Sequence, residues 1–243
     1  MNFHRSCLAA VLFATMIAVG SASANCSNAS TNGAYGFLVL GSAYGEPGTA
    51  VGQLNFDGAG NVSGTQTTSF YGSIYYSPPF TGTYSIARDC TGTMLAGGSV
   101  FNFVLDKDRK GAQVIYAIPG VVYPGSAVAQ GPATCGLPGK KRKFAANLSG
   151  TIVGVGAVAI VGQVRLDGNG NITGGGTFSV TGTISSGSIS GTYTENADCT
   201  GTAQITPEGL STMNLNTVVV DGGRELLMIE TDSGTVVSGT LQQ

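Results

Sequence analysis

The sequence predicts an all-β protein built from two tandem antiparallel β-barrel-like (or sandwich) domains. The first observation behind this prediction is an internal duplication. Cys26 and Cys90 lie 64 positions apart, and Cys135 and Cys199 are separated by the same number of positions. Each second cysteine follows an aspartate and precedes Thr-Gly-Thr, and a Gly-Thr-Tyr segment lies shortly before it. The chain therefore contains two copies of one unit.

The second observation is the local texture of each copy. Short runs of Val, Ile, Thr, Tyr and Phe are broken by glycine, which is typical of antiparallel strands and tight turns. In the second copy we expect eight strands, near 143–151, 155–166, 171–181, 187–195, 200–206, 211–220, 224–231 and 235–241. Eight short strands joined by hairpins favour an up-and-down barrel or a sandwich. Closure into a barrel would also remove exposed strand edges.

Three segments are expected along the chain. Residues 1–24 have the features of a signal peptide: a short polar start, an apolar stretch and the small-residue cleavage site Ala22-Ser23-Ala24. The first β-domain is expected at 25–131 and the second at 132–243. No later stretch is apolar for long enough to span a membrane, so no membrane span is expected after signal removal. The predicted location is periplasmic or secreted.

The two copies align over most of their length. Residues 51–62 match 161–172, and a gap of one residue separates these segments from the cysteines. Further on, we align 103–106 with 218–221, and 127–129 with 236–238.

The cysteines predict two disulfides. Behind a signal peptide, four cysteines indicate an oxidising compartment. Their equal spacing favours Cys26–Cys90 and Cys135–Cys199, each worth on the order of 4 kcal/mol by the chain-entropy estimate. A bridge between the copies, such as Cys90–Cys135, is the alternative.

Composition excludes several classes of function. Only 10% of residues are charged and the net charge is −2, so nucleic acid is not an expected partner. The basic cluster at 140–143 is interpreted as a solvated linker or the charged start of an edge strand. The single histidine, His4, leaves with the signal peptide, which excludes a Ser–His–Asp triad or a Cys–His pair. We expect no cofactor, and a non-catalytic protein is favoured.

Two glycine-rich loops, 57–61 and 167–171, have some features of a calcium loop. A calcium ion takes six to eight oxygen ligands, and each loop offers a single carboxylate. We therefore expect hairpin turns in which the aspartate accepts hydrogen bonds from nearby amides, and no metal site.

A tyrosine and an aspartate recur at fixed spacing, as Tyr84 with Asp89 and Tyr193 with Asp198. They could form an acid–base pair. A core tyrosine followed by a turn aspartate beside the disulfide is the preferred interpretation, because the two side chains fall on opposite faces of a regular strand.

The first copy carries an aromatic insert that the second copy lacks. Its aromatic side chains are Tyr71, Tyr75, Tyr76 and Phe80, and we take them as the candidate ligand or partner surface. Tyrosine is enriched at interfaces because it buries a large area and keeps a polar tip. The alternative is a turn whose aromatic residues pack on the protein itself.

The Asp-Gly-x-Gly-Asn, Gly-Thr-Tyr and Asp-Cys-Thr-Gly-Thr motifs resemble those of uncharacterised secreted bacterial β-repeat proteins. In architecture, an eight-strand meander also resembles calycins such as lipocalins and avidins, and dirigent-type barrels. This likeness implies a small apolar ligand inside a barrel. We expect an exported, non-catalytic binding or structural protein whose partner is a small apolar molecule or another protein. The alternative is a cofactor-free cyclase or isomerase of dirigent-like type.

Overall fold

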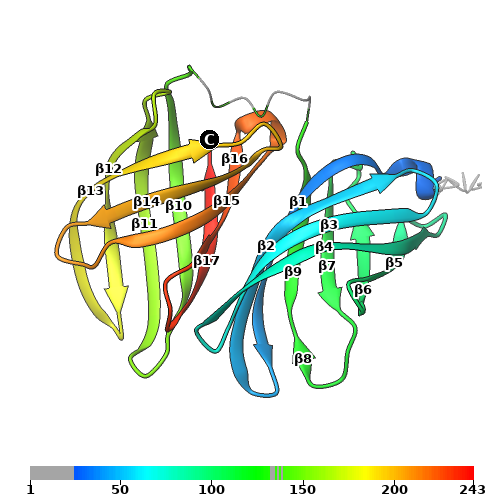
Figure 1. The fold of residues 1–243 in the computed structure, drawn as a ribbon, viewed down its shortest axis with the longest axis horizontal. Coiled ribbons are helices and arrows are strands. Elements are labelled where there is room, and N and C mark those ends of the chain that lie inside the picture. The colour runs from blue at the N-terminus through cyan, green and yellow to red at the C-terminus, as the bar shows by residue number, and fades with distance from the viewer. Residues whose placement is uncertain (1–24, 132–134, 136, 138) are drawn as a thin grey trace, which may run out of the picture.

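The structure, a computed structural model, describes residues 25–131, 135, 137 and 139–243. The expected signal peptide, 1–24, lies outside the described residues. The described chain forms two closed antiparallel barrels of eight strands each, one after the other in sequence (Figure 1). The predicted all-β class is confirmed, and barrels replace the sandwich alternative.

The first barrel closes through its first strand. That strand, β1, pairs with β2 on one side and with β8 and β9 on the other, so that β8 and β9 together take the place of an eighth strand. A short 3-10 helix, η1 (Asn28–Ser30), precedes it. The strands are β1 (Asn32–Ala43), β2 (Glu46–Asp57), β3 (Asn61–Phe70), β4 (Ser73–Ile86), β5 (Thr91–Ala96), β6 (Ser99–Leu105), β7 (Gly111–Tyr116), β8 (Val121–Val122) and β9 (Pro124–Ala129).

The second barrel closes by pairing its first strand with its last. A 3-10 turn, η2 (Asp221–Gly223), joins its sixth and seventh strands. The strands are β10 (Arg142–Ile152), β11 (Gly156–Leu166), β12 (Asn171–Val180), β13 (Thr183–Glu195), β14 (Thr200–Pro207), β15 (Met213–Val220), β16 (Glu225–Glu230) and β17 (Thr235–Gln242). All eight expected strands are present. β13 starts four residues earlier than expected.

Two-residue turns account for that earlier start. Thr181 and Gly182 both have positive φ, 51° and 85°, which is the backbone of a tight hairpin turn. Tyr71 and Gly72 repeat it in the first barrel, with φ of 48° and 74°. The aromatic insert is therefore a turn of two residues followed by strand β4.

The one-residue gap between the copies is a β-bulge. In the β3–β4 pair, Gly64 lies opposite Phe80 and Gln66 opposite Ser77, so Pro78 and Pro79 together face one residue. Neither proline has an N–H to donate to the sheet, which suits the unpaired position of a bulge. The β12–β13 pair of the second barrel keeps one register throughout.

Strand register also corrects the alignment of the later strands. The backbone N–H of Leu105 donates to the carbonyl of Cys90, and that of Val219 donates to the carbonyl of Cys199. Leu105 therefore corresponds to Val219, and Val104 to Val218, one position from the sequence alignment. A slip of one residue exchanges the inner and outer faces of a strand. By the same register, Gly125 of β9 corresponds to Gly239 of β17.

Each barrel holds its own disulfide, as predicted. The bonds are Cys26–Cys90 and Cys135–Cys199, with Cα–Cα distances of 5.0 and 5.1 Å. Each one fastens the segment before the first strand of a barrel to the β-turn that precedes the fifth strand.

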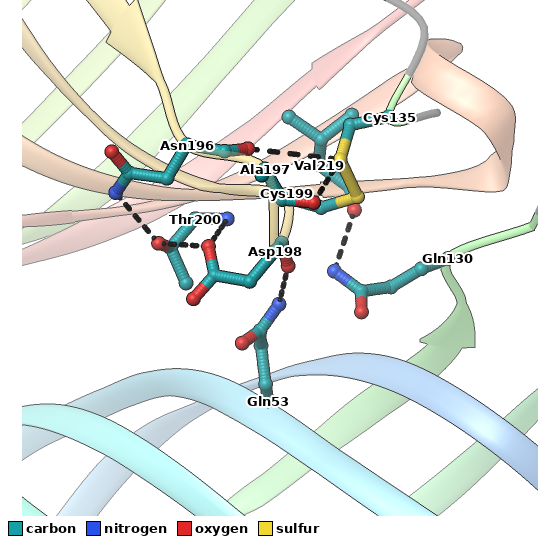
Figure 2. The surroundings of a disulfide bond; sticks show 9 residues. All are labelled: Gln53, Gln130, Cys135, Asn196, Ala197, Asp198, Cys199, Thr200 and Val219. Carbon is teal, nitrogen blue, oxygen red and sulfur yellow. Dashed lines mark hydrogen bonds between the residues drawn. A yellow bond between two sulfur atoms is a disulfide. The ribbon is translucent and has the colours of Figure 1, made fainter. Parts of the chain in front are cut away.

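The barrels pack against each other along the outer faces of β1–β3 and β15–β17. Val51 of the first barrel is buried in a cluster with four side chains of the second: Val218, Val220, Leu227 and Ile229. Hydrogen bonds surround this cluster. Gln130 Nε2 donates to the carbonyl of Val219 at 3.1 Å, and Gln53 Nε2 donates to the carbonyl of Asp198 beside the second disulfide (Figure 2).

Candidate ligand cavity

The interior of the first barrel is hollow. A cavity of about 240 Å³ lies among side chains that are mostly apolar and come from all parts of the barrel wall. Its lining is formed by Phe37, Val39, Leu54, Gln66, Ser77, Pro78, Pro79, Phe80, Met94, Ala96, Gly97, Ser99, Phe101, Val114, Tyr116 and Ala127. The exposed residues Pro78, Pro79 and Gly97 belong to this lining, so the cavity reaches the surface between the bulge and the β5–β6 turn.

The interior of the second barrel is filled. An internal void of about 40 Å³ lies in a lining made mostly of leucine, isoleucine, valine and methionine side chains. A water molecule occupies about 30 Å³ in the liquid, so this void leaves no room for an organic ligand. The two copies share one fold and differ in what their interiors hold.

One row of inward-facing residues differs in size between the two barrels. In the second barrel, Leu148 lies opposite Ile160, and Ile160 opposite Phe178, across three neighbouring strands. All three are at least 97% buried. The corresponding row of the first barrel is smaller at each position: Val39, Ala50 and Thr68.

A second difference lies on the opposite wall. Ala96 takes the position that Ile205 fills in the second barrel, since Met94 corresponds to Ala203 two residues earlier. The bulge at Pro78 and Pro79 adds a bend to the wall of the first barrel, which has no counterpart in the second. Smaller side chains and a bent wall together leave the first interior open.

A few polar groups face the cavity. They are the side chains of Gln66, Ser77, Ser99 and Tyr116. The ring of Tyr116 packs edge-on between Phe101 and Tyr123, with ring centroids 4.3 and 5.6 Å away. Burial, and secondly the neighbouring Tyr116, raise the pKa of Tyr123, so the Tyr123 hydroxyl stays uncharged near neutral pH.

The predicted aromatic surface is divided by the sheet. Phe80 is half-buried and lines the cavity, and Tyr75 lies on the same inner face nearer the barrel end, because its strand partner is Thr68. Tyr76 points outward, into a groove between the barrels, and is 66% exposed. Tyr71 is in the turn. The structure therefore brings only Phe80 of these four residues to the cavity: Tyr75 is 55% exposed and is not part of the lining, and Tyr76 and Tyr71 lie elsewhere.

The glycine-rich loops are turns, as expected. Oδ1 of Asp57 accepts hydrogen bonds from the backbone amides of Ala59, Gly60 and Asn61, and Oδ2 accepts one from the Asn61 side chain at 2.6 Å. The Asn61 side-chain bond first, and then the backbone bonds, lower the pKa of Asp57 to about 2. Asp167 repeats this pattern in the second copy.

The recurring tyrosine and aspartate have separate roles, also as expected. Tyr84 is buried, and its hydroxyl donates to the carbonyls of Asn28 and Thr31. Asp89 is exposed and accepts from the amide and hydroxyl of Thr91 in the turn. The two side chains do not form an acid–base pair.

Sequence reasoning missed two carboxyl groups inside the second barrel. Glu230 is 6% exposed at one end, and burial, followed by the nearby Asp232, raises its pKa to about 7. Glu195 lies at the disulfide end, where burial raises its pKa against the opposing effects of the Leu137 amide and Arg142. Glu230 lies two residues after Met228 and Glu195 two residues after Tyr193, so strand alternation would have placed both carboxyl groups on the inner face.

The fold and the cavity define a class: a tandem β-barrel protein with one hollow and one filled barrel. No family model matches the chain, and a search of the curated proteins finds no relative. In the described part of the chain, no helix is both long enough and apolar enough to cross a membrane.

Proposed function

We propose that the first barrel binds one small apolar molecule and that the protein acts by binding. The observation that carries this proposal is the contrast between a cavity of about 240 Å³ in one barrel and a void of about 40 Å³ in its duplicate. Apolar cavities of about 150 Å³ in other proteins bind molecules the size of benzene. A compact molecule of one or two rings matches the larger volume.

The chemistry of the lining supports binding in preference to acid–base catalysis. Apolar side chains with a few polar groups are the usual composition of ligand sites. Among the described residues that line the cavity, none is a carboxylate or an amine. Gln66 and the Tyr116 hydroxyl would orient a single polar substituent, and the remaining walls would bury the apolar body of the ligand.

We further propose that the protein acts after export to an oxidising compartment, in the periplasm or outside the cell. The two disulfides support this, because such bonds persist mainly where thiols are not kept reduced. The signal-like segment at 1–24 is the second support.

Binding is tested by fluorescence titration with 1-naphthylamine, an uncharged apolar probe of two rings. The double variant Val39→Leu with Ala96→Ile gives the first barrel the larger side chains of the second, Leu148 and Ile205, at two positions that line the cavity. We expect saturable 1:1 binding to the wild-type protein and at least about tenfold weaker binding to the variant, because the added side chains occupy the cavity.

The matched control is Leu95→Phe, which enlarges a side chain of the same barrel that is 52% exposed on the outer face. It should bind the probe as the wild type does. Equal probe binding by the cavity-filled variant, with its circular dichroism unchanged, would contradict the proposal. Native mass spectrometry of protein purified from its host would then identify any molecule retained by the wild type alone.

A further inference from the structure

We propose that copies of this protein associate head to tail, through an intermolecular version of the junction that joins the two barrels. The outer face of β6–β8 of one copy would pack on the outer face of β10–β12 of the next. These two surfaces are the duplicates of the surfaces that already meet inside the chain. In Figure 1, β5 and β6 lie at one flank of the molecule and β12 and β13 at the other. Val104 and Ile115 of the first surface and Val161 of the second are exposed.

The first surface repeats the residues that the second barrel uses at the internal junction. There, Val218, Ile229 and Val236 are at least 96% buried. The register of the strands equates them with Val104, Ile115 and Val122, the same residue types. In the first barrel, however, these three side chains are 50%, 48% and 61% exposed. Their exposure leaves an apolar face without a partner within the chain.

A polar contact of the junction is repeated as well. Asn216 Nδ2 donates to Thr67 Oγ1 at 2.9 Å across the internal junction. Its duplicate on the first barrel is Asn102, which is exposed. The turn at Asp198, whose carbonyl accepts from Gln53, is also duplicated, with the same aspartate-to-threonine hydrogen bonds at Asp89.

The first barrel also has a hollow where the second barrel lines a groove at the internal junction. A groove at the internal junction is walled on the second-barrel side by Asn196, Thr200, Gly201, Thr202, Asn216, Thr217 and Val218. A surface hollow on the first barrel contains the duplicate of every one of them, namely Ala87, Thr91, Gly92, Thr93, Asn102, Phe103 and Val104. The hollow on the first barrel therefore corresponds to the second-barrel wall of the groove, and none of the described residues of this chain forms the facing wall.

The outer face of β10–β12 carries the residues that would form the facing wall. At the internal junction, Val51, Thr67 and Ser69 are at least 92% buried, and Gln53 hydrogen-bonds the Asp198 turn. Their duplicates in the second barrel are Val161, Thr177, Ser179 and Gln163, the same residue types at all four positions. Val161 is 60% exposed.

Some residues differ between the internal junction and the proposed contact between copies, and there apolar residues are replaced by polar ones on both surfaces. On one side, Val220 and Leu227 are replaced by Asp106 and Gln113, and on the other, Leu38 is replaced by Asn147. The internal Val220 lies against Gly36, whose duplicate Ala145 is two residues from Lys143 on the same outer face. Asp106 of one copy would thus lie near Lys143 and Arg165 of the next, which are opposite each other in the β10–β11 pair.

The same comparison indicates a weaker contact than the internal one. A Cβ atom built on Gly36 would lie 2.8 Å from Cγ1 of Val218, whose duplicate Val104 is the same residue, so the close approach there depends on glycine. Ala145 carries that Cβ. The surfaces of two copies must therefore stand slightly further apart, and association should depend on protein concentration. Because a head-to-tail contact does not use up both surfaces, it extends into chains or closes into a ring.

Analytical ultracentrifugation up to millimolar concentration tests the proposal. We expect the wild type to form oligomers as its concentration rises, and Val104→Asp and Val161→Asp each to remain monomeric, because a buried unpaired charge opposes association. An equimolar mixture of the two variants should form dimers and nothing larger, since each supplies the surface that the other has lost. Leu95→Asp is the control, because its duplicate, Gln204, is exposed and therefore is not covered by the internal junction.

A monomeric wild type over the whole concentration range would overturn the proposal. Oligomers that persist in both aspartate variants, or that Leu95→Asp also abolishes, would overturn the assigned surfaces. A mixture of the two variants that stays monomeric would overturn the head-to-tail arrangement. None of these outcomes depends on a ligand in the first barrel.

Discussion

Single residues differ in size between the two barrel interiors. Thr68 and Phe178 occupy the same inward position in the two copies, and Phe178 is fully buried among the side chains that fill the second barrel. The offset of 110 that aligns 51–62 with 161–172 also pairs these two residues. The sequence could not show that the first interior has a cavity, because its volume depends on what Val39, Leu54 and Ala96 contribute from separate strands.

Glu230 makes the stability of the second barrel depend on pH. Its pKa is about 7 in the folded protein, against 4.5 for the free side chain, so the folded state holds more protons between these values. The contribution of Glu230 to the free energy of unfolding should therefore decrease as pH rises from 4.5 to 7, by roughly 3 kcal/mol, and stay level outside that window.

Urea denaturation of Glu230→Gln at several pH values measures this effect. The variant should lose the decrease between pH 4.5 and 7, whereas Glu46→Gln, at an exposed position, should keep it. Parallel stability curves for Glu230→Gln and the wild type would show that this carboxyl ionises in the folded protein as it does in the unfolded chain.

At the scale of strands, the hairpin alternation in the sequence was sufficient to predict eight strands in the second copy. For the aromatic segment, the sequence did not predict a continuous strand, because it does not show that a bulge accommodates Pro78 and Pro79 within β4. Alternation then sends Tyr76 outward while Tyr75 and Phe80 face inward, so one run of sequence contributes to two surfaces.

The free energy of unfolding should be far more sensitive to truncation of the interior row Leu148, Ile160 and Phe178 than to truncation of the corresponding row in the first barrel. Phe178→Ala should lower the free energy of unfolding by about 3–5 kcal/mol, because a filled interior cannot collapse around the cavity. Thr68→Ala, at the matching position of the hollow barrel, should cost less than about 1.5 kcal/mol. Equal losses in chemical denaturation would mean that both interiors are packed alike.

At the scale of the whole molecule, the duplicated chain has one barrel with a filled interior and one with internal space. The filled barrel buries its outer β15–β17 face against the outer face of the hollow one, and side chains such as Gln53 and Gln130 reach across to its disulfide end (Figure 2). The sequence predicted the two units and their disulfides from repeated spacing. It did not predict how the units pack, because Val51 and Val161 are the same residue and only the structure shows which of them is buried.

The most direct test of the central claim is a crystal soaked with iodobenzene, whose iodine is located by anomalous scattering. We predict one strong peak inside the first barrel, among Phe37, Met94 and Tyr116, and no peak inside the second. Peaks confined to the outer surface, or of equal strength in both barrels, would contradict the division into one hollow and one filled barrel.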